Sequence, residues 1–212
     1  MKRIFDILCS AAGLLALGPL LAAIAIIIKR EDRGPVFYRG LRVGLHGKMF
    51  RIFKFRTMIV NAEKIGPAST ANEDPRITRI GKILRKYKLD ELPQLFNVLL
   101  GQMSFVGPRP EVKQFTDMYT EEEKTILTIR PGITDWASIW NSDEGSILAG
   151  AKDPDRTYME IIRPTKLKLQ LKYAREVSFV SDLKIICLTL LAIIKPADPV
   201  ILKIRQELAK IN

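Results

Sequence analysis

The longest apolar stretch of the chain lies close to its N-terminal end. No residue between positions 7 and 28 carries a charge, and such a run of about 22 residues is long enough to cross a bilayer as a helix. Basic residues flank it, Lys2-Arg3 on one side and Lys29-Arg30 with Arg33 on the other. A cleaved signal peptide would have a shorter apolar region followed by a small-residue cleavage site. The pattern therefore predicts an uncleaved membrane segment.

Gly18-Pro19 falls in the middle of this run. Proline removes one helical hydrogen bond and clashes with the preceding turn, so a kink or a break is expected there. Since both ends are basic, the positive-inside preference favours both ends on the cytoplasmic face. Two half-helices of about 20 Å and 14 Å would then enter and leave one leaflet, and Asp6 would stay near the interface, paired with Lys2 or Arg3. A single kinked span is the alternative, and hydropathy does not decide between the two.

Short elements are predicted beyond this segment. Alternation with a period of two indicates strands at 36–38 and 48–55, with glycines at 44 and 47 marking a turn. Apolar residues at helical spacing predict a basic amphipathic helix from about Ile80, which suits either a surface position or an anionic membrane. Pro93 is typical of the first turn of a second helix, which would end near Gly101.

The C-terminal half also favours helices. Residues 120–123 are typical of a capped helix start, and Arg163-Pro164 is expected to interrupt a helix that begins near Arg156. Residues 166–172 alternate strictly, which fits either a strand or a basic helix. The apolar stretch 183–194 is too short to cross a membrane and is expected to be buried or interfacial. The fold class that follows is a mostly helical α/β protein, with a membrane anchor over residues 1–30 and one compact catalytic domain over residues 31–212.

The charge of the chain narrows the choice of partners. A formal net charge of +11 over 212 residues predicts an anionic partner, which could be nucleic acid, an acidic membrane surface or a phosphorylated substrate. Nucleic acid is disfavoured, because the basic residues are scattered among apolar ones and form no recognition helix or zinc module. The chain has one histidine, His46, and its two cysteines, Cys9 and Cys187, lie in apolar runs. Carboxylates are therefore the best candidates for nucleophilic or acid–base chemistry.

One acidic pair stands out. Asp90-Glu91 precedes the predicted Pro93 helix, where the helix dipole favours ionised carboxylates, and the basic residues at 85, 86 and 88 act in the same direction. An ionised aspartate can attack phosphorus, and a neighbouring glutamate can help to hold Mg²⁺, which would offset the repulsion between two anions. Ordinary helix capping is the alternative reading of such a pair.

Several basic residues strengthen the chemical reading. Lys54 and Arg56 follow a strand-like run, whereas Arg109 and Arg130 lie beside prolines in predicted loops. Arginine binds phosphate with two parallel hydrogen bonds, and a proline-stiffened loop lowers the entropy lost in holding it. Each residue alone could be an ordinary loop charge. Together with the acidic pair they predict a phosphate-rich substrate at the bilayer surface.

The motifs, taken in order, resemble those of the bacterial sugar transferase family, the small monotopic phosphoglycosyl transferases that begin lipid-linked glycan assembly. The matching pieces are Lys2-Arg3 with Asp6, residues 34–37, Gly47-Lys48 with Phe50, 54–58, 74–81, 89–97, 104–110, and 130–134 with Trp136. They cover most of the chain, and their joint specificity far exceeds that of any single motif.

This resemblance implies a reaction, a cofactor and partners. A sugar-1-phosphate would pass from a nucleoside diphosphate sugar, usually a UDP-sugar, to polyprenol (undecaprenyl) phosphate at the bacterial cytoplasmic membrane, with release of UMP. The resemblance also implies two Mg²⁺-dependent steps through a covalent phosphosugar on Asp90, with Glu91 beside it at the metal. Membrane lipids would surround a re-entrant anchor broken at Gly18-Pro19, and the catalytic domain would face the cytoplasm.

The resemblance also assigns roles to basic residues. Arg85 is expected to support the substrate phosphates or the lipid headgroup, Arg109 to contact the nucleotide sugar, and Arg130 to lie near the active site. Lys54 and Arg56 are weaker candidates for the same site. A homodimer is compatible with the sequence, which does not decide the oligomeric state.

The chain departs from the family pattern in places. Gly40 occupies a position where Gln is expected, Asp135 replaces the Gly usual before Trp136, and residues 139–142 replace an Asn-Gly-Arg-like stretch. The region 136–175 is therefore where sugar preference is least determined by the resemblance. A non-catalytic membrane scaffold that recruits glycan-assembly partners is the alternative function, although it leaves the intact acidic pair unexplained.

Overall fold

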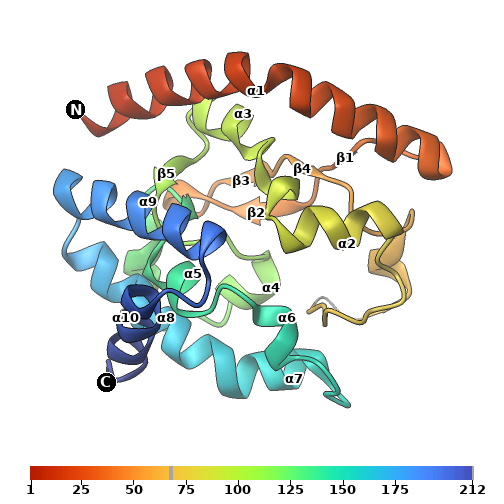
Figure 1. Ribbon diagram of the computed structural model, residues 1–212. Coiled ribbons are helices and arrows are strands. Elements are labelled where there is room, and N and C mark those ends of the chain that lie inside the picture. Colours follow the sequence, from red (N-terminus) through yellow and green to blue (C-terminus); the bar gives the residue numbers. More distant parts are fainter. Residues whose placement is uncertain (67–68, 212) are drawn as a thin grey trace.

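A long helix lies along one side of a mostly helical domain in the computed structural model (Figure 1), which describes residues 1–66 and 69–211. The α-helices are α1 (Lys2–Asp32), α2 (Arg79–Lys86), α3 (Gln94–Leu99), α4 (Lys113–Thr116), α5 (Trp136–Trp140), α6 (Glu144–Ile147), α7 (Pro154–Thr157), α8 (Arg163–Arg175), α9 (Phe179–Ile194) and α10 (Pro199–Ala209). The 3₁₀ helices are η1 (Leu45–Gly47), η2 (Ala62–Lys64), η3 (Leu89–Glu91) and η4 (Glu123–Thr128), and η5 (Tyr158–Ile162) is a π-helix.

Helix α1 corresponds to the predicted membrane segment. Within the described ranges it is the one helix that is long and apolar enough to cross a membrane by itself, whereas α9 and α10 reach that length only as a pair bent by 119°. The two separate half-helices predicted at Gly18-Pro19 are replaced by one helix, whose axis changes direction near its middle (Figure 1). Helical backbone continues through Pro19 because its fixed φ suits a helix. The missing N–H and the clash of its ring with the preceding turn account for the change of direction.

Both ends of α1 bind the domain. At the N-terminal end, Lys2 Nζ donates to the Val106 carbonyl at 2.8 Å and to Asp182 at 2.5 Å. Asp6 is buried and accepts from Ser104 Oγ at 3.1 Å and from the Phe105 amide at 3.2 Å. The predicted pairing of Asp6 with Lys2 or Arg3 is therefore wrong, since successive turns of the helix direct these side chains to different partners.

The C-terminal end of α1 is held by two acidic residues. Asp32 accepts hydrogen bonds from both terminal nitrogens of Arg56, whose Nε donates to the Pro35 carbonyl. Glu31 accepts the backbone amide of Arg79 at 2.9 Å, and this carboxylate satisfies a free N–H at the start of α2. The end of the apolar helix, the segment that follows β4 and helix α2 are thus joined by polar contacts.

Three small sheets position the loops of the domain. Strands β1 (Phe37–Tyr38) and β4 (Lys54–Phe55) are antiparallel, as are β2 (Leu41–Val43) and β3 (Met49–Arg51). Strands β5 (Ser104–Val106) and β6 (Gly132–Thr134) are parallel, with Ser104 opposite Gly132. The predicted strands at 36–38 and 48–55 are confirmed, although the second is divided into β3 and β4, and the predicted turn contains η1.

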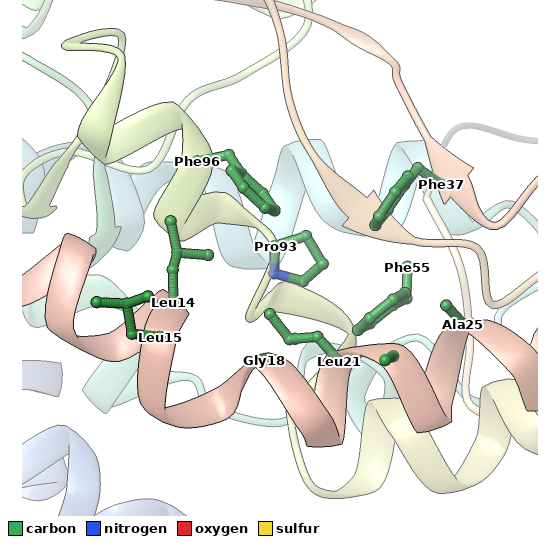
Figure 2. Close-up of a pocket in the computed structure, with 10 residues that line it drawn as sticks. Leu14, Leu15, Gly18, Leu21, Ala25, Phe37, Phe55, Pro93 and Phe96 are labelled. Atoms are coloured by element: carbon green, nitrogen blue, oxygen red, sulfur yellow. The ribbon is translucent and has the colours of Figure 1, made fainter.

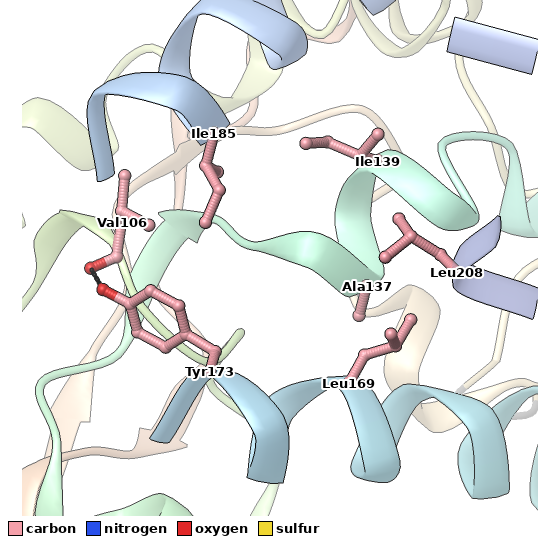
Figure 3. Packing of buried hydrophobic residues seen from close by; sticks show 7 residues of the cluster. All are labelled: Val106, Ala137, Ile139, Leu169, Tyr173, Ile185 and Leu208. Carbon is pink, nitrogen blue, oxygen red and sulfur yellow. Dashed lines mark hydrogen bonds between the residues drawn. The ribbon is translucent and has the colours of Figure 1, made fainter. Parts of the chain in front are cut away.

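The C-terminal half contains the main apolar core (Figure 3). Its buried members come from β5, α5, α8, α9 and α10, and they are Val106, Ala137, Ile139, Leu169, Tyr173, Ile185 and Leu208. The alternating stretch 166–172 is helical, as part of α8: Leu169 packs into this core, whereas Leu167 and Leu171 pack against Tyr119 and Ile126. Arg163-Pro164 begins α8 directly after the π-turn of η5, so the interruption predicted there is a local change of helix type. Thr120 and Glu123 form the predicted reciprocal cap.

Candidate active site

The acidic pair lies in η3, the short turn that connects α2 to α3. Lys88 adopts a left-handed backbone conformation (φ 56°) directly before it, which reverses the chain at the end of α2. Asp90 is 7% exposed. No residue that the structure describes donates a hydrogen bond to its carboxylate. Asp90 is thus a nearly buried acid without a hydrogen-bond donor.

Glu91 has the opposite surroundings. Lys54 Nζ donates to Glu91 Oε1 at 2.9 Å. The guanidinium of Arg109 donates to both carboxylate oxygens, reaching Oε2 at 3.1 Å and making its closer contact with Oε1. The side chain of Glu91 is 15% exposed. Two of the predicted basic residues therefore converge on Glu91 and leave Asp90 unpaired.

These surroundings shift the pKa values of the two carboxyl groups in opposite directions. Burial raises the pKa of Asp90, and the charge of Lys54 opposes this shift without cancelling it. Burial alone would also raise the pKa of Glu91, but Arg109 and Lys54 together hold it well below its ordinary range. The sequence argument expected the helix dipole and the cations to favour both ionised forms, and for Asp90 this is wrong because desolvation dominates.

Arg85 approaches Asp90 from α2. Its Nε donates to Thr57 Oγ1 at 2.9 Å, and its charge lowers the pKa of Asp90. Close packing brings it there, since a Cβ on Gly81 would lie 2.1 Å from the Thr57 carbonyl oxygen. Glycine at position 81 therefore permits α2 to contact the backbone of Thr57, just after β4, directly. The terminal nitrogens of Arg85 have no hydrogen-bond partner within residues 1–66 and 69–211 and remain available for an anion.

Two predicted site residues lie elsewhere. The guanidinium of Arg56 is bound to Asp32 and the Pro35 carbonyl, so it joins α1 to β4 instead of facing the acidic pair. Arg130 Nε donates to the Gly101 carbonyl at 3.0 Å. This places Arg130 beyond the C-terminal end of α3, whereas the acidic pair precedes its N-terminal end.

Asp135 is a site residue that sequence reasoning treated only as a departure from the family pattern. It is 1% exposed and accepts the backbone amide of Arg109 at 3.2 Å, Gln170 Nε2 at 3.1 Å and the Ser138 amide at 2.7 Å. This carboxylate therefore caps α5 and fixes the loop that carries Arg109. The signal in the sequence was the aspartate itself, which is a favoured residue directly before a helix.

Gln94 is a second residue that the sequence did not single out. It follows Asp90 by one helical turn and is fully buried, and neither polar atom of its amide has a hydrogen-bond partner among the residues described. An unpaired buried amide is costly, so it marks a place where a further polar group is needed.

Metal binding at this site would depend on few protein oxygens. The described part of the chain holds no cluster of three or more His, Cys, Asp or Glu side chains that could bind a metal ion. Mg²⁺ does not require such a cluster, since it commonly uses one or two carboxylates, water and substrate phosphates. The unpaired carboxylate of Asp90 fits this kind of donor set, whereas both oxygens of Glu91 already accept hydrogen bonds.

Several known proteins are similar to this chain over most of its length. The chain is 41% identical over 196 residues to an undecaprenyl-phosphate glucose phosphotransferase of Komagataeibacter xylinus, covering 89% of this chain and 35% of that protein. It is 36% identical to the UDP-glucose:undecaprenyl-phosphate glucose-1-phosphate transferase of Escherichia coli K12, covering 89% of this chain and 39% of that protein. It is 33% identical to the exopolysaccharide production protein ExoY of Sinorhizobium fredii, covering 91% and 84% of the two chains.

The chain thus spans little more than a third of the length of the first two relatives and most of the third. The model of one protein family, described as bacterial sugar transferase, matches residues 1–196, a range that includes α1, the acidic pair and the core helices α5, α8 and α9. With this match over most of its length, the chain belongs to the bacterial sugar transferase family.

Proposed function

We propose that this protein transfers a sugar-1-phosphate from a UDP-sugar to undecaprenyl phosphate or a related polyprenol phosphate, and so begins the assembly of a lipid-linked glycan. The observation that carries the proposal is the arrangement of the acidic pair. Asp90 is nearly buried and has no hydrogen-bond donor among the described residues, and the adjacent Glu91 is neutralised by Lys54 and Arg109. The relatives named for undecaprenyl-phosphate sugar transfer support the same reaction class.

In the first step, an Asp90 oxygen attacks the phosphorus that carries the sugar. The bond between this phosphorus and the bridging diphosphate oxygen breaks, and UMP leaves with that oxygen. Desolvation suits the reaction, because a carboxylate with a raised pKa and no hydrogen-bond donor is a stronger nucleophile than a solvated one. In this scheme Arg85 binds the phosphate oxygens, which is supported by its terminal nitrogens having no hydrogen-bond partner among the described residues.

In the second step, a phosphate oxygen of the polyprenol phosphate attacks the same phosphorus. The bond between Asp90 and phosphorus breaks, the polyprenyl diphosphate sugar leaves, and the Asp90 carboxylate is restored. Glu91 stays ionised through both steps, because Lys54 and Arg109 hold its pKa low. Its role in this scheme is to fix the positions of these two cations beside the reacting phosphates.

Mg²⁺ is the proposed cofactor. Asp90 and, after a shift of Lys54 or Arg109, Glu91 would hold it, and it would supply charge neutralisation between the nucleophile and the diphosphate. Lys54 and Arg109 contribute positive charge at the same place whether or not the metal is bound.

The membrane arrangement of α1 is part of the proposal. Lys2 and Asp6 at one end of the helix, and Asp32 at the other, all contact the same domain. A helix that crossed the bilayer would separate its two ends by a hydrocarbon core of about 30 Å and could not make both sets of contacts with one domain. This supports a monotopic protein whose anchor enters a single leaflet from the cytoplasmic face.

The test is a reaction with radiolabelled donors in the presence of Mg²⁺. UDP-glucose, UDP-galactose and UDP-N-acetylgalactosamine are each supplied, with and without undecaprenyl phosphate, and UMP release and labelled protein are measured. We expect label to remain on the protein without acceptor and to pass to lipid when acceptor is added. Asp90→Asn should abolish both, whereas Asp117→Asn, a matched change at an exposed surface ion pair, should change neither. Failure of every donor to label the protein or release UMP would favour the scaffold alternative.

A further inference from the structure

A second buried carboxylate, Glu111, lies two residues after Arg109 in the chain. It is 5% exposed, and Lys166 Nζ lies 2.7 Å from its Oε1. The hydroxyl of Tyr158 donates to the same oxygen at 2.6 Å, and the hydroxyl of Tyr119 donates to Oε2 at 3.3 Å. Lys166 Nζ also donates to the Tyr158 hydroxyl at 2.8 Å. We call Glu111, Lys166 and Tyr158 the Glu111 cluster.

The cluster contains a buried ion pair. Burial alone would raise the pKa of Glu111, but Lys166 holds it below its ordinary value. Burial alone would lower the pKa of Lys166, but Glu111 raises it above its ordinary value. Both groups are therefore ionised. A buried ion pair adds little net stability over neutral side chains of the same shape, because taking two charges out of water costs about as much as their attraction returns. Stability alone therefore does not account for this pair.

A change of helix type brings the cluster together. Tyr158 begins the π-helix η5, and Lys166 lies eight residues later in α8. In a regular α-helix, positions eight apart differ in direction by about 80°. A π-turn holds more residues than an α-turn, so η5 reduces this difference, and both side chains reach the same carboxylate oxygen. Such π-turns are frequently found at functional sites.

The loop that carries Arg109 is anchored on both sides of this residue. Before it, the Asp135 carboxylate accepts the backbone amide of Arg109 at 3.2 Å. After it, the Glu111 carbonyl accepts the Val43 amide at 2.9 Å, and the Glu111 carboxylate belongs to the cluster. Prolines at positions 108 and 110 restrict the backbone between these anchors. The two buried carboxylates thus fix the backbone from which the Arg109 side chain extends.

We infer that Glu111 and Lys166 are positioning residues for Arg109, and that their ion pair holds its guanidinium where the diphosphate of the donor binds. This inference rests on the proposed function. The ion pair acts through Arg109 and does not itself touch the donor. The Arg109 side chain is long and 32% exposed, so its direction depends on its backbone. Displacement of a substrate-binding group by about 1 Å can slow a reaction about a hundredfold.

The test removes the ion pair and determines whether the effect requires Arg109. Glu111→Gln combined with Lys166→Met removes both charges and nearly keeps the side-chain lengths, so neither charge is left buried and unpaired. Tyr158→Phe is a milder change in the same cluster, which is used as well in case the combined variant folds poorly. Ile201→Ala is the control for lowered stability, because Ile201 is fully buried in α10, a helix that packs on α5 and α9.

Equilibrium binding of the donor is the main measurement. Each variant is combined with Asp90→Asn, which removes the proposed nucleophile, so binding is followed without turnover. The ligand is the one among UDP-glucose, UDP-galactose and UDP-N-acetylgalactosamine that labels the wild type, with Mg²⁺ present. Each variant is then made again together with Arg109→Ala. The four dissociation constants of this cycle give the coupling between the cluster and Arg109.

We expect loss of the ion pair to weaken donor binding about tenfold when Arg109 is present, the effect of about one charge-assisted hydrogen bond. With Arg109→Ala the same change should alter the dissociation constant less than about twofold, because the group that the cluster positions is absent. Tyr158→Phe should give the same pattern with a smaller effect. Ile201→Ala should leave binding within about twofold in both backgrounds. With Asp90 restored, labelling of the ion-pair variant by donor should be slowed by up to about a hundredfold.

Two results would overturn the inference. Equal weakening with and without Arg109 would show that the cluster supports the whole domain and not this side chain. Unchanged binding when Arg109 is present would show that the ion pair does not position it. If the combined variant does not fold, the same comparison with Tyr158→Phe decides. Failure of all three donors to label the wild type would instead refute the proposed function, and the inference with it, so the two failures are distinguishable.

Discussion

The guanidinium of Arg109 donates hydrogen bonds to both carboxylate oxygens of Glu91. Lys54 binds the same carboxylate from β4, and Asp90, one residue earlier, receives no hydrogen bond from the described residues. Two adjacent acids are thus placed in opposite electrostatic states by one short 3₁₀ turn. Their roles in the proposed reaction follow from this difference, and so do two predictions about stability.

Asp90→Asn is expected to stabilise the fold at neutral pH. Because burial raises the pKa of Asp90, folding disfavours its ionised form, and this cost is fully present above the folded pKa. It vanishes below the ordinary aspartate value of about 3.9, where the group is protonated in both states. Unfolding in detergent micelles between about pH 4 and pH 8 should show the advantage of the variant shrinking as pH falls. An advantage that is independent of pH would contradict this account.

Glu91→Gln is expected to have the opposite effect. Arg109 and Lys54 hold the pKa of Glu91 below its ordinary value, so the carboxylate contributes stability above the unfolded value of about 4.3. That stability is lost as pH falls through the folded pKa. The variant should lose about 2 kcal/mol of unfolding free energy at neutral pH, since two partly buried cations lose their charged partner. The difference in unfolding free energy between wild type and variant should become smaller in acid. An equal difference at every pH would show that the ion pairs of Glu91 do not cause it.

Arg56 gives a prediction that separates structure from catalysis. Its guanidinium is buried and binds Asp32 and the Pro35 carbonyl at the end of α1, so Arg56→Ala should cost about 1–2 kcal/mol through the loss of these hydrogen bonds. Activity per folded molecule should change little, whereas Arg109→Ala should reduce it strongly. A double-mutant cycle with Asp32→Asn measures the coupling between the two side chains. A coupling near zero, or a large loss of kcat at full stability, would indicate that Arg56 contacts the substrate instead of stabilising the fold.

Particular residues show what the sequence could and could not predict. The uncharged apolar run predicted α1, helical spacing of apolar residues predicted α2, and Pro93 predicted the start of α3, because each of these signals is local in the sequence. The association of Lys54 and Arg109 with the acidic pair was also predicted, through the shared chemistry of phosphate binding. The binding of Arg56 to Asp32 depends instead on how α1 lies across the domain, a contact between residues 24 positions apart.

The desolvation of Asp90 also could not be predicted from the sequence. Sequence gives the charges near a carboxylate but not how completely the protein excludes water from it. Asp135 illustrates the same limit, since its position before a helix was readable, whereas its hydrogen bond to the backbone of Arg109 requires that two distant loops meet. An apolar groove beside Pro93 likewise exists only because α1 packs over α3 and the β1–β4 sheet (Figure 2).

Gln94 provides the last prediction. Its amide is fully buried without a partner among the described residues, so Gln94→Met, which keeps the length of the side chain, should change the unfolding free energy by no more than about 1 kcal/mol or should raise it. If the amide serves the reaction, the same variant should lose turnover at unchanged stability. Asn97→Ala is the control, for which the opposite result is expected. Asn97 binds the Phe53 amide and the Arg51 carbonyl, and its loss should lower stability first. The opposite result would be a Gln94→Met protein that is fully active and markedly less stable. It would show that the amide makes a favourable contact in the fold and has no role in the reaction.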